Sequence, residues 1–291
     1  MKRLRRSMLF IPGNNPGMLQ NASVFRADSV IVDLEDAVSL TEKDSARTLV
    51  EEAIKALDFS SVELVVRVNP LDTEYGLKDI EAMAKVRPDG LMIPKATEEQ
   101  LKTIDEILIR IEKDENFETG SLKLFPIIET AYGLETVYSI INSSKRVTAV
   151  LLGAEDLTSD FGIKRTKEGD EIAYARNRVS AACRAARVDA IDTPFTDTND
   201  YEGLALDTSK AKSLGFTGKA AINPRQIPTI HSVFAPTETE IKYAIRVLDA
   251  RDEAEEKGLG VFSLDGKMVD APIINRAITT VELAKLLGLI S

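Results

Sequence analysis

The chain has 291 residues, 44% of them hydrophobic, which is enough apolar material for one large domain or two small ones. Its formal charge of −10 opposes nonspecific binding to nucleic acids, because that binding needs a basic surface to neutralise phosphates. A single cysteine excludes an intramolecular disulfide and a cysteine-ligated metal cluster.

The N-terminus carries a basic cluster, Met1–Arg6, that resembles the start of a secretory signal. The apolar stretch after it, Met8–Ile11, ends at Pro12 and is too short for the hydrophobic part of such a signal. The lone Cys183 lies in an alanine-rich helical pattern, which predicts an inert, buried thiol and fits a reducing compartment. We therefore expect a cytoplasmic protein that contacts no membrane.

Apolar, β-branched runs of strand length recur along most of the chain. They are Met8–Ile11, Ser29–Asp33, Leu64–Val68, Leu91–Ile93, Leu122–Ile128, Ala149–Leu152, Ala190–Asp192 and Lys219–Ile222. The segments between them, such as Thr41–Leu57, Glu98–Lys113 and Ala173–Arg187, have the apolar spacing of helices. Eight strand–helix units with no flexible linker favour an α/β fold of the closed (β/α)8 type, a TIM barrel, over an open doubly wound sheet.

The pattern changes after Pro236. Thr237–Lys257 predicts a highly charged helix, Val261–Val269 a hairpin that turns at Asp265-Gly266, and Pro272–Leu287 an amphipathic helix. We therefore predict a catalytic barrel domain over 1–235 and a helix–hairpin–helix extension over 236–291. Because the barrel closes without this extension, a lid or a subunit contact is its expected use.

Two predicted strands end at carboxylates, Glu129 and the pair Glu155-Asp156. The C-terminal ends of barrel strands build the active site, so these side chains are expected to meet there. Oxygen ligands without histidine or cysteine favour Mg2+, and Glu129 and Asp156 are the predicted ligands. The alternative is that each carboxylate only stabilises the start of a helix.

Arg67 ends another predicted strand, where a long cation is expensive to bury unless it is paired. Its planar fork suits a substrate carboxylate or carbonyl, and an internal pair with Asp33, Glu35 or Asp36 is the alternative. One of these acids is expected to serve Arg67 or the waters of the metal, and Asp36 is the predicted one. Arg67 and Asp36 are accordingly predicted catalytic residues.

Other polar or turn residues at strand ends are predicted to contact the substrate, namely Pro12, Gly13, Asn69, Lys95 and Asn223. Lys95 could form a Schiff base with a carbonyl substrate, but the many nearby carboxylates favour a salt bridge instead. The only histidine, His231, lies beyond the last strand, so histidine-based acid–base chemistry is not expected.

Seven motifs in order resemble the citrate lyase β-subunit family within the HpcH/HpaI aldolase group. They are Arg6–Gly13, Asp33–Val38, Arg67–Asn69, Ile128–Thr130, Gly153–Leu157, Ala221–Pro224 and Gly266–Pro272. The resemblance spans nearly the whole chain. It implies a Mg2+-dependent carbon–carbon lyase on a barrel, which splits a β-hydroxyacyl thioester carried by coenzyme A or an acyl carrier protein.

A citrate lyase β subunit of this kind releases oxaloacetate from a citryl thioester and leaves an acetyl thioester. Relatives act on malyl-CoA or citramalyl-CoA with the same core residues. The resemblance also implies α and γ subunits as partners and a homo-oligomer, for example a trimer. In it, Asp270 from a neighbouring subunit would be the acid–base group at the enolate carbon, although Asp270 could simply begin the last helix.

Two other functions stay open at this point. One is a Schiff-base aldolase that uses Lys95, and the other is a barrel that serves as a noncatalytic binding or assembly subunit. The second is disfavoured because all the polar groups of the predicted site are present, yet a fold alone does not establish catalysis.

Overall fold

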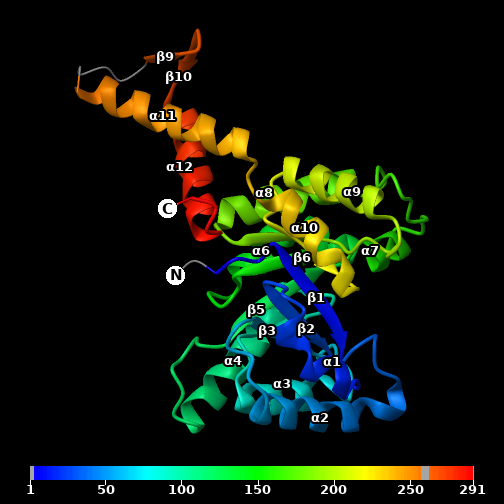
Figure 1. Cartoon of the computed structure of the whole chain (residues 1–291). Coiled ribbons are helices and arrows are strands. Elements are labelled where there is room, and N and C mark those ends of the chain that lie inside the picture. The colour runs from blue at the N-terminus through cyan, green and yellow to red at the C-terminus, as the bar shows by residue number, and fades with distance from the viewer. Residues whose placement is uncertain (1–2, 257–261, 291) are drawn as a thin grey trace. The chain divides into compact units, whose positions relative to one another are not determined.

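The computed structural model describes residues 3–256 and 262–290 (Figure 1). They fall into two compact units, Met1–His231 and Ser232–Ser291. The division lies inside one helix, close to the boundary at 235 that the composition suggested.

The first unit is a closed barrel of eight strands in sequential order, in which β1 pairs in parallel with both β2 and β8. The strands are β1 (Ser7–Pro12), β2 (Ser29–Asp33), β3 (Glu63–Arg67), β4 (Gly90–Ile93), β5 (Lys123–Ile128), β6 (Ala149–Leu152), β7 (Asp189–Asp192) and β8 (Gly218–Ala221). The predicted TIM barrel is therefore confirmed, with strand ends that differ from the prediction by at most one residue.

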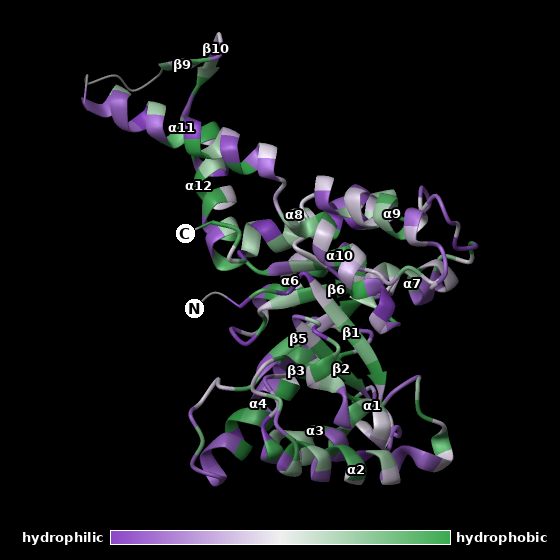
Figure 2. Ribbon diagram, viewed as in Figure 1, coloured by the Kyte–Doolittle hydropathy of each residue, from purple (hydrophilic) through white to green (hydrophobic). Residues whose placement is uncertain are grey.

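Helices follow the strands around the barrel (Figure 1). They are α1 (Pro16–Gln20), α2 (Lys43–Ala56), α3 (Gly76–Val86), α4 (Glu98–Asp114), α5 (Ala131–Glu135), α6 (Val137–Asn142), α7 (Ala154–Asp160), α8 (Ala173–Ala186), α9 (Tyr201–Ser213) and α10 (Ile227–Phe234), with short 3-10 helices η1 (Ala22–Val24), η2 (Leu40–Glu42) and η3 (Pro224–Gln226). Figure 2 shows hydrophobic strands and helices of mixed character, as expected when each helix buries one face against the barrel.

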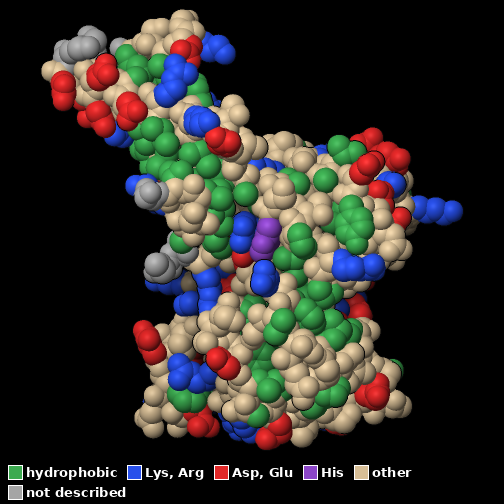
Figure 3. Space-filling view, viewed as in Figure 1, with side chains coloured by type: hydrophobic (Ala, Val, Ile, Leu, Met, Phe, Trp, Pro, Cys, Tyr) green, Lys and Arg blue, Asp and Glu red, His purple; other side chains and the backbone are tan. Residues whose placement is uncertain are grey.

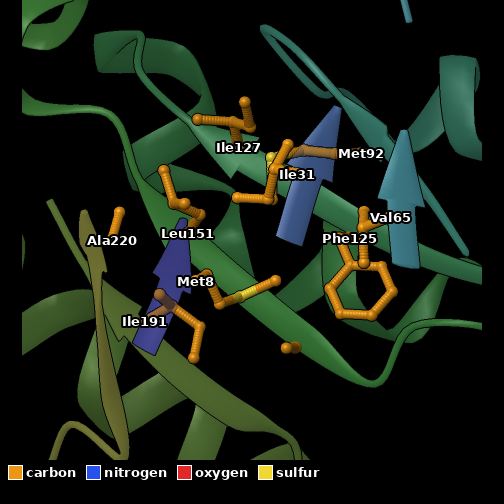
Figure 4. Packing of buried hydrophobic residues seen from close by; sticks show 10 residues of the cluster. Met8, Ile31, Val65, Met92, Phe125, Ile127, Leu151, Ile191 and Ala220 are labelled. Atoms are coloured by element: carbon orange, nitrogen blue, oxygen red, sulfur yellow. The ribbon is translucent and has the colours of Figure 1, made fainter. Parts of the chain in front are cut away.

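Side chains from all eight strands fill the barrel interior (Figure 4). They are Met8, Ile31, Val65, Met92, Phe125, Ile127, Ala149, Leu151, Ile191 and Ala220, each at most 3% exposed. Because these side chains are almost fully buried, the barrel interior is a packed core and not a channel. Burying one large apolar side chain stabilises a fold by roughly 1.5–3 kcal/mol.

Ion pairs gather at the N-terminal end of the barrel. Arg5 makes a bidentate pair with Glu63, at 2.8 Å for both bonds, and a third bond of 2.8 Å to Asp189. Arg146 makes a bidentate pair of 2.7 Å bonds with Glu112. Although burial opposes ionisation, the hydrogen bonds from Arg146 lower the pKa of Glu112 to about 2.

The two residues predicted to be structural have structural surroundings. His231 Nε2 lies 2.7 Å from the hydroxyl of Ser7 and 3.5 Å from Asp28, and burial lowers its pKa. Cys183 is buried, and its burial raises the pKa of the thiol to about 12. Neither residue lines the cavity at the opposite end of the barrel.

The second unit contains α11 (Glu238–Glu256), an antiparallel hairpin of β9 (Phe262–Leu264) and β10 (Lys267–Val269), and α12 (Ala271–Leu286). It has its own small core around Val247 and Val269. The predicted helix–hairpin–helix extension is therefore present, while Lys257 and Val261, at the predicted element ends, lie outside the described residues.

Among the described residues, no helix has both the length and the apolar character needed to cross a bilayer. On the face shown in Figure 3, acidic and basic side chains are interspersed with apolar ones.

Candidate active site

A cavity of about 440 Å³ opens at the C-terminal end of the barrel. The residues that line it come from the ends of β1, β2, β3, β5 and β6 and from the segments that follow β6, β7 and β8; they include Pro12, Asp33, Asp36, Arg67, Glu129, Glu155, Asp156, Thr193 and Ile222. This is the end at which TIM barrels carry their active sites.

Glu129 directly follows β5 and is only 3% exposed. The next residue, Thr130, caps α5 by accepting a 3.0 Å hydrogen bond from the Gly133 amide, so Glu129 itself is not the cap. Its Oε1 accepts a 2.7 Å hydrogen bond from the backbone amide of Lys95. Burial, with added repulsion from Glu35 and Asp156, nevertheless raises the pKa of Glu129 to about 8.

The position of Glu129 depends on Gly153, which sequence reasoning did not single out as a functional residue. A Cβ atom at Gly153 would lie 2.7 Å from both Cβ and Oε2 of Glu129. Real Cβ atoms do not approach other atoms this closely, so a side chain at this position would displace the carboxylate. The contact joins the end of β5 to the end of β6, and nothing in the local sequence of either strand shows it.

Asp156 is half-buried in the first turn of α7, where it lines the cavity together with Glu155. The chain is helical here and not extended, so strand alternation does not decide which acid faces the cavity. Glu155 is exposed and lies 3.8 Å from Nε of Arg165, whereas the half-buried Asp156 is one of the acids whose charge raises the pKa of Glu129.

Glu129 and Asp156 fit the predicted magnesium site. In the described part of the chain, no three histidine, cysteine or acidic side chains form a ready-made metal cage. Mg2+ does not need one, because it commonly binds through one or two carboxylates and keeps waters or substrate oxygens as its other ligands. Burial, with repulsion from the neighbouring acids, raises the pKa of Glu129, and a divalent cation held by Glu129 and Asp156 would favour its ionised form.

Arg67, which ends β3, lines the cavity but is also held by acids from the end of β2. Its Nε and Nη2 donate to the two oxygens of Asp33 at 2.7 and 2.6 Å. Its Nη1 lies 2.8 Å from Glu35 as an ion pair without hydrogen-bond geometry, and 3.3 Å from Asp36. Although burial alone would lower it, these acids raise the pKa of Arg67. The internal pair is thus present, and substrate binding by Arg67 stays a prediction.

Asp33 and Asp36 differ in their surroundings. Asp33 is 2% exposed and accepts further hydrogen bonds from the backbone amides of Glu35 and Ala37, so it orders the loop that follows β2. The side chain of Asp36 is 68% exposed and faces the cavity. Because it is exposed, Asp36 is free to move, as its predicted role requires. Burial raises the pKa of the neighbouring Glu35 to about 7 despite the opposing charge of Arg67.

Asn69 and Asn223 are not among the residues that line the cavity. The Asn69 amide is 4% exposed and donates to the Leu34 carbonyl at 2.9 Å and to Asp79 at 2.6 Å. Asn223 caps η3, where its side chain accepts from the Arg225 amide at 3.0 Å. Both side chains have structural partners, so this structure gives no support to their predicted substrate contacts.

Pro12 lines the cavity, whereas the amide of Gly13 already donates to the Asp33 carbonyl at 2.8 Å. That amide is therefore not free to bind a substrate. Lys95 has a left-handed backbone, with φ of 46°, and its side chain is exposed. Within the described residues it forms no salt bridge, contrary to the expectation, and it lacks the desolvated setting of a Schiff-base lysine.

Asp270 lies in the second unit, immediately before α12. Its side chain accepts a 3.4 Å hydrogen bond from the Ile273 amide, and a proline occupies the first turn of the helix. The alternative reading of Asp270 as a helix start is thus present. A role in catalysis stays a prediction.

Comparison with known proteins agrees with this geometry. Residues 6–224 match the family described as HpcH/HpaI aldolase/citrate lyase. The chain belongs to this family. It is 46% identical over 284 residues to the citrate lyase subunit beta of Leuconostoc mesenteroides subsp. cremoris, covering 97% of this chain and 94% of that protein. The corresponding protein of Haemophilus influenzae is 44% identical, with 97% and 98% covered. The human mitochondrial citramalyl-CoA lyase is more distant, at 30% identity with 96% and 85% covered.

Solved structures of this family share the barrel. The CitE protein of Mycobacterium tuberculosis, in complex with magnesium, acetoacetate and coenzyme A, has a TM-score of 0.82 at 28% identity, covering 98% of this chain and 100% of that one. The citrate lyase beta subunit of M. tuberculosis, complexed with oxaloacetate and magnesium, has a TM-score of 0.67 at 27% identity, covering 80% and 98%. Both of these M. tuberculosis structures contain magnesium together with a small keto acid.

Proposed function

We propose that this protein is a cytoplasmic citrate lyase β subunit, a Mg2+-dependent lyase that cleaves a citryl thioester into oxaloacetate and an acetyl thioester. The observation that carries the proposal is the cavity in which Glu129 and Asp156 lie together with Arg67. The 46% identity to a citrate lyase subunit beta supports this choice of substrate. The oxaloacetate and magnesium in the M. tuberculosis protein support the product and the cofactor.

The charge of the cavity supports a metal-dependent reaction. The citryl group is an anion, and the cavity wall already contains Asp36, Glu129 and Asp156. Arg67 is balanced by Asp33, so it does not offset these charges alone. When bound, Mg2+ would lower the pKa of the substrate hydroxyl and polarise the adjacent carboxylate.

The side chains of the protein divide the remaining work. Glu129 and Asp156 hold the cation, and the amide of Lys95 orients Glu129. Arg67 lines the cavity with its Nε and Nη2 held by Asp33, so Nη1 is the donor that can stabilise negative charge on a substrate oxygen once Asp36 moves away. Asp36 is exposed enough to shift as substrate enters, and it would exchange its 3.3 Å contact with Arg67 for ordered water or substrate.

As the carbon–carbon bond breaks, the substrate hydroxyl gives its proton to water and becomes the keto group of oxaloacetate. The acetyl thioester leaves with the bonding electrons as an enolate, so a proton must reach its carbon. We assign that proton to Asp270 of a neighbouring subunit in a homo-oligomer, for example a trimer, which assembles with citrate lyase α and γ subunits. Mixing two inactive variants, Glu129→Gln and Asp270→Asn, tests this assignment, because only a site built from two chains is repaired by co-assembly. No recovered activity after verified subunit exchange would exclude the shared site.

A malyl-CoA or citramalyl-CoA lyase is the second candidate, because the human citramalyl-CoA lyase is 30% identical over most of this chain. The acyl group could also be carried by coenzyme A and not by an acyl carrier protein, since the M. tuberculosis CitE structure contains coenzyme A. The cavity lining described above does not distinguish these substrates by charge.

One assay tests the proposal against both alternatives. Purified protein is incubated with citryl, malyl and citramalyl thioesters, each on coenzyme A and on acyl carrier protein, with Mg2+ or with EDTA. We expect oxaloacetate from the citryl thioester only with Mg2+, and little product from Glu129→Gln. Pyruvate or glyoxylate release at a higher rate would assign the chain to the second candidate. No product from any thioester would favour a noncatalytic subunit, and a borohydride-trapped keto acid would identify a Schiff-base enzyme.

A further inference from the structure

The helix that carries Asp156 has an unusual start. Its N-cap residue is Gly153, which has no side chain that could accept a hydrogen bond from an amide of the first turn. Side-chain caps normally satisfy amides at this point. A residue with a capping side chain cannot replace Gly153, because its Cβ would lie 2.7 Å from the carboxylate oxygen of Glu129. The start of α7 must therefore be held from elsewhere.

Thr193 supplies that contact from the neighbouring strand. It follows β7, is 1% exposed and lines the cavity. Its hydroxyl accepts a 3.2 Å hydrogen bond from the amide of Ala154, the first residue of α7. Asp156 lies two residues further along the same turn, so a shift of Ala154 would move Asp156 as well.

Thr193 is in turn held by a buried charge cluster, which we define as Arg176, Asp192, Asp207 and Lys219. Lys219 of β8 donates to the Thr193 carbonyl at 2.7 Å and to Asp192 and Asp207 at 2.6 Å each. Arg176 of α8 donates to Asp192 through two 2.9 Å bonds and to Asp207 at 2.7 Å. The residue before Thr193 and its own carbonyl are thus fixed by cations from two elements.

The buried charge cluster is balanced, with two cations and two carboxylates, each at most 5% exposed. Balanced buried ion pairs add little net stability compared with apolar residues of the same volume, because desolvation offsets their attraction. What such a cluster provides is a defined geometry, since its ion pairs tie Asp192 and Asp207 to both Arg176 and Lys219, although Nη1 of Arg176 is buried without a partner. Through Lys219, the cluster fixes the position of the Thr193 backbone at the edge of the cavity.

We propose that Thr193 is a positioning residue for the metal ligand Asp156. Its hydroxyl caps α7 from the adjacent strand, and the buried charge cluster holds the backbone of Thr193 in place. The inference rests on the proposed magnesium function of Glu129 and Asp156, and it assigns to Thr193 no contact with the metal or the substrate.

The test compares Thr193→Val, which keeps the shape of the side chain and removes the acceptor, with Thr193→Ser, which keeps the acceptor. Thr208→Val is the matched control, because Thr208 is equally buried in α9 and its hydroxyl donates only to the Leu204 carbonyl. Binding of Mn2+, which takes the same oxygen ligands as Mg2+, is followed by electron paramagnetic resonance. Exchange of the Ala154 amide hydrogen is measured in metal-free protein.

We expect Thr193→Val to weaken Mn2+ binding about tenfold, as loss of a group that orients a ligand typically does. The same variant should speed exchange at Ala154. Thr193→Ser and Thr208→Val should behave like the wild type in both measurements. If the valine variant does not fold, Thr193→Ala, which adds no methyl group at the hydroxyl position, takes its place.

Unchanged Mn2+ affinity in Thr193→Val would overturn the inference while leaving the magnesium site intact. Equal weakening in Thr193→Ser or in Thr208→Val would also overturn it, because shape or general loosening would then be the cause. A wild-type protein that binds no Mn2+ would overturn the proposed magnesium site, and the positioning role with it. Hydrogen exchange would in that case still report whether Thr193 caps α7.

Discussion

Glu112 and Glu129 belong to the same barrel and are each 3% exposed, yet the pKa values of their carboxylates are shifted in opposite directions. At the N-terminal end, hydrogen bonds from Arg146 outweigh burial and lower the pKa of Glu112 to about 2. At the C-terminal end, burial prevails and raises the pKa of Glu129 to about 8. Glu112 has a bidentate cation, whereas Glu129 has one backbone amide and two acidic neighbours.

The difference separates stability from function within one fold. A buried carboxylate that is fully paired supports the structure and has no capacity left for a ligand. One that is buried and underpaired costs free energy, and it persists where a cation or substrate completes it. The contrast follows the general division of TIM barrels, in which the N-terminal end serves stability and the C-terminal end serves chemistry.

The largest expected effect comes from unpairing the N-terminal end. Arg146→Met leaves Glu112 buried without its cation, and breaking a buried pair in this way typically costs about 3–5 kcal/mol. Urea unfolding measures the loss. Arg110→Met, on the helix α4 that also carries Glu112, is the control, because Arg110 and its partner Glu81 are 62% and 44% exposed and lie 3.6 Å apart. We expect the control to change stability by less than about 1 kcal/mol. An equally small effect for Arg146→Met would remove the basis of the contrast.

The next effect concerns the metal. Glu129→Gln removes one of two carboxylate ligands, so we expect Mg2+ affinity to fall about 10- to 100-fold. The metal-free variant should be at least as stable as the wild type at neutral pH, because a glutamine needs no proton uptake when it is buried, whereas folded Glu129 has a pKa of about 8. Glu112→Gln should do the reverse, with lower stability and unchanged Mg2+ affinity. Calorimetric titration and thermal melting of both variants measure this, and unchanged Mg2+ binding in Glu129→Gln would refute the ligand assignment.

The pH dependence of stability should have opposite signs at the two ends. Folded Glu129 keeps its proton up to about pH 8, whereas an unfolded glutamate loses it near pH 4.5, so metal-free protein should lose stability as pH rises between these values. Glu112 has a folded pKa of about 2, so the stability from this group is present above pH 4.5 and is lost as pH falls toward 2. Each group contributes a slope of roughly 1 kcal/mol per pH unit while it titrates.

Melting curves in EDTA across pH 3–9 would show two branches. The acidic branch, below pH 4.5, comes from Glu112, and the more alkaline branch, between pH 4.5 and about 8, comes from Glu129. Glu129→Gln should flatten the alkaline branch only, and Glu112→Gln the acidic branch only. Added Mg2+ should also flatten the alkaline branch of the wild type. An alkaline branch that is identical in Glu129→Gln and wild type would place the raised pKa on another group.

The smallest effect is a change in thiol reactivity. Burial raises the pKa of Cys183 to about 12, and the thiol stays neutral at physiological pH. We expect slow modification of native protein by a thiol reagent at pH 8 and rapid modification after unfolding. The rate in Arg146→Met should rise in proportion to its unfolded population. Fast labelling of stable, native wild-type protein would show that the structure around Cys183 opens locally.

The sequence predicts the architecture well, because strand identity is a local property. The run Ser29–Asp33 is apolar and β-branched, and it forms β2 with the same bounds. The ends of β5 and β6 likewise place Glu129 and Asp156 at the cavity. Strand alternation stops being informative where the strand stops. Asn69 lies two residues beyond β3, in irregular backbone, and its side chain donates to Asp79 instead of lining the cavity.

Contacts between elements distant in sequence are the part that local patterns do not contain. The use of Thr193 to cap α7 requires the ends of β6 and β7 to be adjacent. Even the correct barrel topology gives only that adjacency and not the atom that makes the bond. The choice of Asp33 as the bidentate partner of Arg67, among three neighbouring acids, depends in the same way on side-chain packing.

The contact between Gly153 and Glu129 has a consequence for how this family changes over generations. The two positions share one volume, because a Cβ at 153 would occupy the space of the glutamate carboxylate. A shorter aspartate at 129 would vacate only the space of the carboxylate, because its own Cβ would still lie 2.7 Å from a Cβ at 153. Residue 153 must therefore stay a glycine while residue 129 has a side chain. Among homologues we therefore expect glutamate at 129 to be inherited together with glycine at 153, as a linked pair.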